Sequence, residues 1–372
     1  MPILRRDRSL SRTATLAAAL ALALSVAAPP ASAEAGSPLQ KALDGVVAAG
    51  APGAVAEFQG ERGVWRGASG VADVRSPRPP DPRSHWRIAS ITKTFTATVT
   101  LQLAGEGRIG LDDPVGRYLP GLLPDGDRIT VRMLLQHTAG TYNYVADLLG
   151  TPQQVRDTYR TTYRPADLVG IANAHGPAFP PGERWAYDNT GYIVLGMLIE
   201  KVTGRPADRV VTDRIVRPLG LAHTRFPVTG TRLPRPRLHG YFPDERGRPE
   251  DITAANPSSG WTTGAMISNA ADLNAFLRAL LGGRLLPPRL LAEMRRTVRA
   301  EDATRGYGLG LRRNELPCGR TVWGNIGIAF GYTTYAFQDG RRALTVVGSL
   351  AGPPDWSRLE PALSRVLTTA FC

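Results

Sequence analysis

The feature that most constrains the fold is a change of hydrophobic period along the chain. Runs with the two-residue alternation of β-strands occur near both ends, and longer apolar segments with helical spacing lie between them. A three-residue turn at 60–62 separates the first two runs, and Asp339-Gly340 is a hairpin signal between the last two. Strands are predicted at 53–59, 63–70, 307–311, 321–323, 332–338 and 343–350.

Helices are predicted mainly in the interval between these two groups of strands. They are expected at 39–49, 90–106, 130–136, 165–174, 193–202, 208–217, 272–281 and 356–371. This order favours an α+β fold, in which an antiparallel sheet built from both termini is flanked by helices and carries an inserted helical lobe. We expect an α/β lobe at about 37–85 and 300–372, a helical lobe at about 86–299, and a site in the cleft between them.

The first 33 residues have the pattern of a signal peptide. A basic region at 5–12 precedes an apolar stretch at 14–28 that is too short to span a membrane comfortably, and Ala31-Ser32-Ala33 is a small-residue cleavage site. We expect a mature chain that begins near Glu34, is secreted and keeps no stable membrane anchor. The alternative is an uncleaved anchor, which the Pro29-Pro30 break disfavours.

Composition excludes some classes of partner. The 372-residue chain has a formal charge of +13 and a pI of about 10.3. Its arginines are interspersed with acids rather than gathered in a run, so nucleic-acid binding is not indicated. The five histidines lack the spacing of metal ligands, and no metal site is expected.

The only two cysteines are Cys318 and Cys372. In an oxidising compartment a minimal even pair most simply forms one disulfide, which would tie the C-terminal residue to a loop between strands. The alternative is two free thiols.

Chemistry is indicated first by Ser90 and Lys93, which lie three residues apart and share one helix face. A serine hydroxyl needs a neighbouring base, and a lysine amine serves as one only if burial or nearby charge lowers its pKa. The surrounding residues are apolar or small, and lysine occurs elsewhere only as Lys41 and Lys201. These facts support a nucleophile with its base, but the segment alone leaves the alternative, a solvated helix face, equally open.

Further motifs place this pair in a known family. Tyr187-Asp188-Asn189 has the Tyr-x-Asn pattern, and longer runs match at 118–124, 189–192, 196–200 and 306–312. With these motifs the chain resembles the serine β-lactamase/DD-peptidase superfamily from about residue 39 to 372. It is most similar to secreted serine D-Ala-D-Ala carboxypeptidases, which carry a matching disulfide, and to class C β-lactamases. The resemblance implies a β-lactamase/transpeptidase-like fold.

The resemblance also implies catalytic roles. Ser90 would attack a carbonyl and form an acyl-enzyme without metal or cofactor, while Lys93 and Tyr187 share the proton transfers. Backbone N–H groups of Ser90 and Ile328 would form the oxyanion hole.

Two side chains would contribute to substrate binding. The resemblance implies that Asn189 holds a substrate amide carbonyl and that Trp261 is an aromatic residue of the cleft wall. Judged from the residues alone, Tyr187 and Trp261 are equally compatible with core packing.

One motif departs from the family pattern. The resemblance predicts a Lys or His, a hydroxyl residue and a glycine on the strand beside the cleft, but this chain has Asn325, Ile326 and Gly327. Losing one hydrogen bond to a charged group costs about 1.5–3 kcal/mol, which weakens carboxylate binding. The resemblance assigns Arg312 to grip the same carboxylate. The similar run at 137–140 lies in the predicted helical lobe and is interpreted as structural.

These features predict a secreted D-alanyl-D-alanine carboxypeptidase that acts on peptidoglycan peptides, with β-lactams as further ligands. An esterase or amidase with the same Ser-Lys-Tyr core is the first alternative, favoured by Asn325 and Ile326 and disfavoured by Arg312. A penicillin-binding protein with little turnover is the second. We expect a monomer.

Overall fold

The computed structural model describes residues 36–300, 304–352 and 354–372. Its largest element is an eight-stranded sheet in the order β2-β1-β12-β11-β10-β9-β8-β7, with every neighbouring pair antiparallel. The strands are β1 (Gly53–Gly60), β2 (Gly63–Gly70), β7 (Val298–Arg299), β8 (Arg305–Tyr307), β9 (Arg312–Glu315), β10 (Thr321–Ala329), β11 (Tyr332–Gln338) and β12 (Ala343–Ser349).

The sheet joins the two ends of the chain, as the sequence predicted. The N-terminal strand β1 pairs with the C-terminal strand β12, so that Ala54 lies opposite Gly348. Both faces of β1 are covered: Ala54 and Ala56 are buried in one hydrophobic cluster and Val55 in another. This strand is therefore a central one and forms part of two cores.

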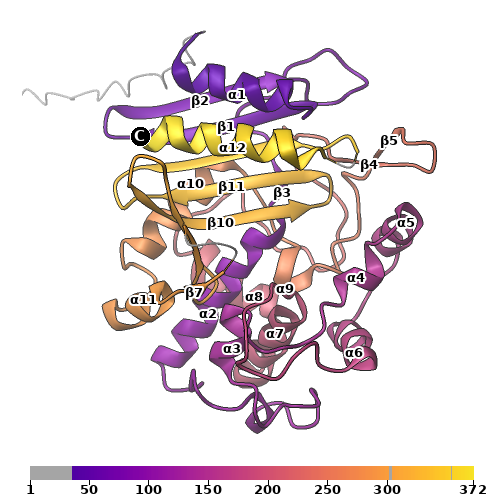
Figure 1. Cartoon of the computed structure of the whole chain (residues 1–372), viewed down its shortest axis with the longest axis vertical. Coiled ribbons are helices and arrows are strands. Elements are labelled where there is room, and N and C mark those ends of the chain that lie inside the picture. The colour runs from indigo at the N-terminus through magenta and orange to yellow at the C-terminus, as the bar shows by residue number, and fades with distance from the viewer. Residues whose placement is uncertain (1–35, 301–303, 353) are drawn as a thin grey trace, which may run out of the picture. The chain divides into compact units, whose positions relative to one another are not determined.

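Two helices cover one face of the sheet (Figure 1). They are α1 (Pro38–Ala48) and α12 (Trp356–Phe371), and they pack against each other and against the outward face of the central strands. Ser37 caps the start of α1 by accepting a hydrogen bond from the Gln40 N–H. The amphipathic pattern of both segments made them predictable.

The remaining helices lie on the opposite side of the sheet (Figure 1). The helix α10 (Ala270–Leu281) packs directly on the sheet, where Asn274 donates to the Glu57 carbonyl and accepts from the Thr345 hydroxyl. The others are α2 (Thr92–Gly105), α3 (Val131–Gln136), α4 (Val145–Leu148), α5 (Pro152–Arg160), α6 (Pro165–His175), α7 (Thr190–Thr203), α8 (Ala207–Val211), α9 (Trp261–Gly264) and α11 (Pro288–Arg295). Short helical turns η1 (Ala89–Ile91), η2 (Val115–Arg117) and η3 (Thr212–Val216) connect them.

Two small sheets complete the fold. The strands β3 (Trp86–Arg87) and β6 (Ile267–Ser268) pair beneath the main sheet, and β4 (Tyr241–Pro243) pairs with β5 (Pro249–Asp251) in a hairpin. The β3–β6 pair anchors the chain immediately before η1.

One prediction of local structure was wrong, and two had the right element type with different bounds. The run 307–311 is the turn between β8 and β9 rather than a strand, because Gly310 has a φ of 78° and the chain reverses there. The strand predicted at 321–323 extends to Ala329, and the helix predicted at 208–217 is divided between α8 and the π-helical η3.

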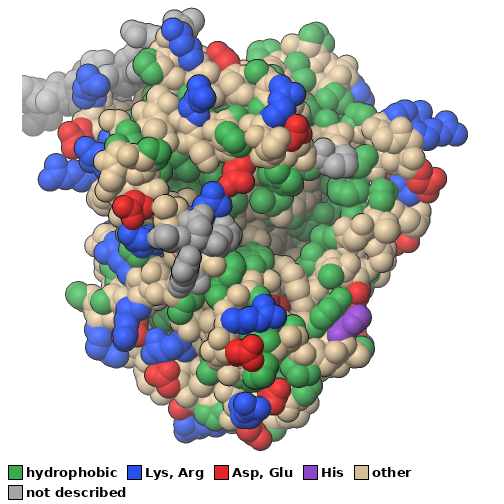
Figure 2. Space-filling model, viewed as in Figure 1, with side chains coloured by type: hydrophobic (Ala, Val, Ile, Leu, Met, Phe, Trp, Pro, Cys, Tyr) green, Lys and Arg blue, Asp and Glu red, His purple; other side chains and the backbone are tan. Residues whose placement is uncertain are grey.

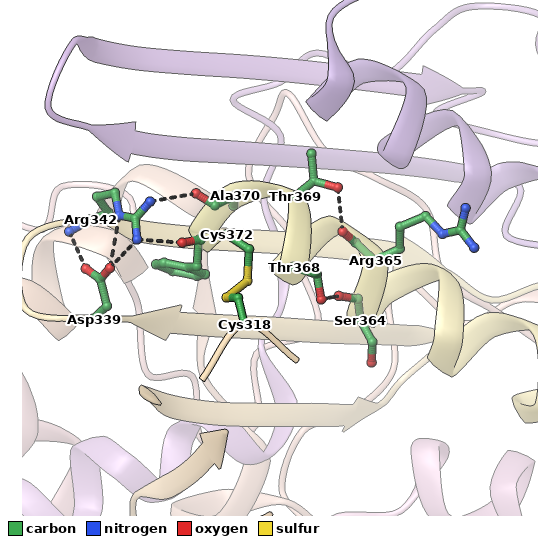
Figure 3. The surroundings of a disulfide bond; sticks show 10 residues. Cys318, Asp339, Arg342, Ser364, Arg365, Thr368, Thr369, Ala370 and Cys372 are labelled. Carbon is green, nitrogen blue, oxygen red and sulfur yellow. Dashed lines mark hydrogen bonds and ion pairs between the residues drawn. A yellow bond between two sulfur atoms is a disulfide. The ribbon is translucent and has the colours of Figure 1, made fainter. Parts of the chain in front are cut away.

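The disulfide is present between Cys318, in the turn between β9 and β10, and Cys372 at the end of α12 (Figure 3). Nearby, the Arg342 side chain donates to the carbonyls of Ala370 and Phe371 and pairs with Asp339. These contacts hold the C-terminal turn of α12 against the sheet.

The proposed signal peptide falls outside the described residues. Among the residues that are described, no helix has the length and apolarity needed to cross a membrane. The same residues contain no cluster of three or more side chains suited to a metal ion.

Candidate active site

Ser90 is the middle residue of the turn η1, two positions before α2 begins at Thr92. The backbone reaches this position through Ala89, whose φ of 48° is unusual for a residue with a side chain. The Ile88 N–H donates to the Met266 carbonyl at 3.0 Å and ties the turn to the β6 side. The nucleophile predicted from the sequence is therefore held at a helix start, where N–H groups favour negative charge.

Lys93 is completely buried in the first turn of α2. Its Nζ lies 3.1 Å from the Ser90 Oγ, 2.7 Å from the Asn189 Oδ1 and 3.1 Å from the Thr263 carbonyl oxygen. The last two are acceptors only, whereas a hydroxyl can donate as well as accept. In the charged form the amine donates one N–H group to each of the three oxygens. In the neutral form it would keep two N–H groups for the acceptors and direct its lone pair to the Ser90 O–H.

The electrostatic environment of Lys93 affects the pKa of its amine. Burial is the main cause that lowers the pKa of its amine, and the positive charge of Arg312 lowers the pKa further. Tyr187 and Asp188 oppose this by favouring the charged amine. No carboxylate forms an ion pair with Lys93 among the described residues, which leaves desolvation as the dominant effect.

The Tyr-x-Asn motif lies at the start of α7, across from α2. Asn189 precedes the first residue of the helix, and its amide also donates from Nδ2 to the Asn143 Oδ1 at 3.0 Å. Asp188 accepts from the N–H groups of Thr190 and Gly191 at 2.7 and 2.9 Å. In this arrangement Asn189 orients Lys93, and its contact with a substrate carbonyl stays a prediction.

Tyr187 is half-buried and lines the same cavity as Ser90. The Lys93 Nζ is 5.1 Å from the centre of the Tyr187 ring. The imidazole of His137 also packs against this ring, with the two ring centres 4.5 Å apart. Burial lowers the pKa of His137, and its Nδ1 accepts from the Asp188 N–H at 3.3 Å. The segment 137–140 therefore packs through His137 against Tyr187, for which a role in proton transfer is predicted.

The strand β10 passes directly beside the nucleophile. A Cβ on Gly327 would lie 2.2 Å from the Ile88 carbonyl oxygen and 3.3 Å from the Ser90 nitrogen. Only a residue without a side chain allows this approach. The next residue, Ile328, is 47% exposed and lines the cavity with Ser90, so the two proposed oxyanion donors belong to adjacent backbone segments.

The other two residues of the altered motif do not face the cavity. Asn325 is buried, donates to the Thr94 hydroxyl at 3.0 Å and accepts from the Ile326 N–H. Ile326 packs into the cluster formed with α1 and α12. Both residues were expected to bind substrate, and neither lines the cavity. A buried amide needs hydrogen-bond partners, and the bond from Asn325 to Thr94 links β10 to α2.

Two further residues predicted to bind substrate lie outside the cavity wall. The Trp261 side chain is buried in the core, close to Gly196 of α7, and does not form the cleft wall. Arg312 lies at the start of β9 with its guanidinium carbon 5.7 Å from the Tyr307 ring centre, and it is not part of the cavity wall.

The cavity at Ser90 has an empty volume of about 550 Å³ and no charged residue in its wall. Figure 2 shows this side of the molecule hollowed below the sheet, where hydrophobic side chains gather. The wall is formed by Ser90, Tyr144, Val145, Leu148, Leu149, Tyr159, Tyr187, Asn189, Ser259, Gly260, Thr263, Gly264, Ile328, Ala329 and Phe330. Its composition suits a neutral, apolar group.

Sequence reasoning missed most of this wall. The α4–α5 segment supplies Leu148 and Tyr159, and the turn after β10 supplies Phe330. Thr151-Pro152 is a helix-start signal, since the Thr151 hydroxyl accepts from the Gln154 N–H, and it could have revealed α5. No local signal identifies the carbonyl of Thr263 as a partner of Lys93.

Comparison with known proteins agrees with the fold. A D-stereospecific amidohydrolase from Streptomyces sp. superposes with a TM-score of 0.82 and 40% identity, covering 90% of this chain and 98% of that one. Esterase EstB of Burkholderia gladioli is 30% identical over 288 residues, which are 66% of this chain and 71% of the esterase.

A third relative matches over a shorter part of its length. Penicillin-binding protein 4* of Bacillus subtilis (strain 168) is 31% identical over 191 residues, which are 51% of this chain and 40% of that protein. The match therefore covers less than half of that relative. The Beta-lactamase family profile matches residues 39–367, nearly all of the described chain. This chain belongs to the beta-lactamase family of serine hydrolases.

Proposed function

We propose that this protein is an amidohydrolase that cleaves amides and esters of D-amino acids with apolar side chains through an acyl-enzyme on Ser90. The observation that carries the proposal is the uncharged, aromatic-lined cavity at the nucleophile. The 40% identity to an amidohydrolase described as D-stereospecific supports the reaction type and the stereochemistry.

The cavity wall argues against a free carboxylate as the main recognition element. A carboxylate that enters an uncharged cavity loses hydration and gains no ionic partner there, which costs several kcal/mol. Arg312, the residue assigned to such a group, lies outside the wall. A carboxypeptidase must bind that carboxylate, whereas an amidase or esterase need not.

The geometry accounts for acyl transfer. The lone pair of Lys93 accepts the Ser90 proton as the Ser90 Oγ attacks the carbonyl carbon, and the N–H groups of Ser90 and Ile328 would stabilise the oxyanion. The bond to the leaving amine or alcohol then breaks, and that group takes a proton from Lys93 or Tyr187. Water hydrolyses the resulting Ser90 ester in the reverse sense and releases the acid.

The second candidate function is the D-Ala-D-Ala carboxypeptidase that the motifs predicted. One observation favours it: the Arg312 guanidinium carbon is 5.7 Å from the Tyr307 ring centre, and the Tyr307 ring lies 4.6 Å from His137, which packs against Tyr187. The two candidates differ in how they treat the terminal charge of a substrate.

A matched pair of substrates separates the two candidates. Purified protein is assayed with D-phenylalanine amide, L-phenylalanine amide, and a D-Ala-D-Ala peptide with either a free or an amidated C-terminus. We expect the D-amide to exceed the L-amide, and the amidated peptide to exceed the acid. Ser90→Ala should lower each activity by at least about a thousandfold. Faster cleavage of the free acid would favour the carboxypeptidase, and an unchanged Ser90→Ala variant would overturn the mechanism.

We also propose that the protein is exported and cleaved near Glu34. The disulfide between Cys318 and Cys372 supports this, since such bonds persist in oxidising compartments. The test is mass spectrometry of the protein recovered from culture medium; a chain that stays in the cells with residues 1–33 attached would contradict it.

A further inference from the structure

Phe330 forms one wall of the cavity and separates it from a buried cation. The guanidinium carbon of Arg87 is 5.4 Å from the centre of the Phe330 ring, at a distance typical of a cation–π contact. The Tyr159 ring also stacks on Phe330, with centroids 5.0 Å apart and an interplanar angle of 24°. Phe330 and Tyr159 line the cavity, whereas Arg87 does not.

Arg87 is unusual because it has no acidic partner among the described residues. Its side chain is fully buried, and its Nη2 donates to the carbonyls of Thr231 and Ala255 at 3.1 and 2.6 Å. Its Nε and Nη1 have no hydrogen-bond partner. Burial lowers its pKa only to about 10, so the group stays charged at neutral pH.

A buried guanidinium with two unused donors is a ready anion site. In this structure the aromatic ring of Phe330 lies over the guanidinium group of Arg87. We propose that Phe330 determines acyl specificity: it covers Arg87 and thereby keeps the cavity selective for neutral acyl groups, and its removal would open an anion subsite. This inference rests on the proposed function only in that the cavity receives the acyl part of the substrate.

The position of Phe330 is held by its neighbours rather than by its own backbone preference. Its φ of 56° is costly for a residue with a side chain. The segment that contains Gly240 packs closely on the turn, since a Cβ on Gly240 would lie 2.5 Å from the Phe330 carbonyl oxygen. The stack with Arg87 and Tyr159 offsets the cost, and a glycine at 330 would relieve it.

The test uses the full chain and two nitrophenyl esters of similar acyl length, one neutral (hexanoate) and one anionic (hydrogen glutarate). Phe330→Gly removes the ring and suits the backbone, and Phe330→Leu keeps an apolar cover. Leu148→Ala enlarges the same cavity at a different wall residue, leaves the Phe330 ring over Arg87, and is the matched control. Circular dichroism and thermal unfolding establish that each variant is folded.

The measured quantity is kcat/KM for the anionic ester divided by that for the neutral ester. We expect Phe330→Gly to raise this ratio about tenfold or more, the effect of one hydrogen bond to a charged group. Phe330→Leu and Leu148→Ala should change it less than about twofold. Adding Arg87→Met to Phe330→Gly should abolish the gain.

An unchanged ratio in Phe330→Gly, or an equal rise in Leu148→Ala, would overturn the proposal. If Arg87→Met does not fold, the first three variants still decide the outcome. The assay uses simple esters, so its result does not depend on D-amino acid amides being substrates. If the wild-type protein cleaves no D-amino acid amide, the proposed amidohydrolase function is refuted, but the role proposed for Phe330 is not.

Discussion

At the scale of single residues, the proposed mechanism depends on a buried lysine whose amine pKa is lowered by burial. Lys93 has three oxygen partners and no ion-paired carboxylate among the described residues, and burial lowers its pKa. Arginine could not replace it, because a guanidinium keeps its proton at any accessible pH. This explains why a chain rich in arginine has a lysine here.

The first prediction concerns Lys93. Because the neutral amine is the reactive form, kcat/KM should rise with pH through the lowered pKa of Lys93 and level off above it. Lys93→Arg should lower kcat/KM by about 10²–10⁴-fold at every pH. The control is Lys201→Arg, since Lys201 is exposed on α7. A Lys93→Arg variant within tenfold of wild type would contradict this role.

The second prediction concerns Asp188, whose pKa burial raises to about 6. The folded protein therefore keeps a proton that the unfolded chain loses above about pH 4, so this group makes the free energy of unfolding fall as pH rises from 4 to 6. A difference of about two between the folded and unfolded pKa corresponds to about 3 kcal/mol.

Asp188→Asn keeps the shape and most hydrogen bonds but removes this titration. Urea unfolding measured between pH 4 and 7 should show wild type losing up to about 3 kcal/mol relative to the variant over this range. Parallel pH dependences for the two proteins would refute the prediction.

At the scale of elements, the site is made by the contact between β10 and the turn η1. Most elements could be predicted, since the alternation in 332–338 and the amphipathic pattern in 356–371 are local properties, and β11 and α12 have those bounds. The run 307–311 was mistaken for a strand because its alternating Gly and apolar residues match the period, although the glycines serve the turn.

The third prediction tests the contact between β10 and η1. Gly327→Ala would place a Cβ 2.2 Å from the Ile88 carbonyl oxygen, so β10 must move away from Ser90 and carry the Ile328 N–H with it. We expect kcat/KM to fall by about 10²–10³-fold, the cost of losing one oxyanion donor.

Gly348→Ala on β12 is the matched control, because its Cβ would meet only side-chain atoms at 3.2 Å or more. That variant should retain activity within about twofold. Equal effects of the two substitutions would indicate a general loss of sheet stability rather than a local one.

At the scale of the whole molecule, the two ends of the chain are joined twice, by the pairing of β1 with β12 and by the disulfide. The bond links residues 54 positions apart on the face covered by α12 (Figure 3). The cavity at Ser90 lies on the helical side of the sheet, so the disulfide contributes to stability and not to chemistry.

The fourth prediction follows from this separation. Replacing Cys318 and Cys372 with serine should lower the free energy of unfolding by about 2–4 kcal/mol, because the unfolded chain regains the freedom of that loop. Ester hydrolysis at 25 °C should stay within about twofold of wild type. Loss of activity in a variant that remains folded would show that the bond positions the site.

The sequence by itself determined the family pattern, the antiparallel sheet from both termini, and the proximity of Ser90 and Lys93, because period and short spacing are local properties. Tertiary structure alone decided which side chains face the cavity. Asn325 and Ile326 turn away from it, and Trp261 is buried in the core. Phe330 and Tyr159 form the wall instead, from segments distant in sequence. The physical reason is that a cavity wall depends on how distant elements pack, which no local pattern encodes.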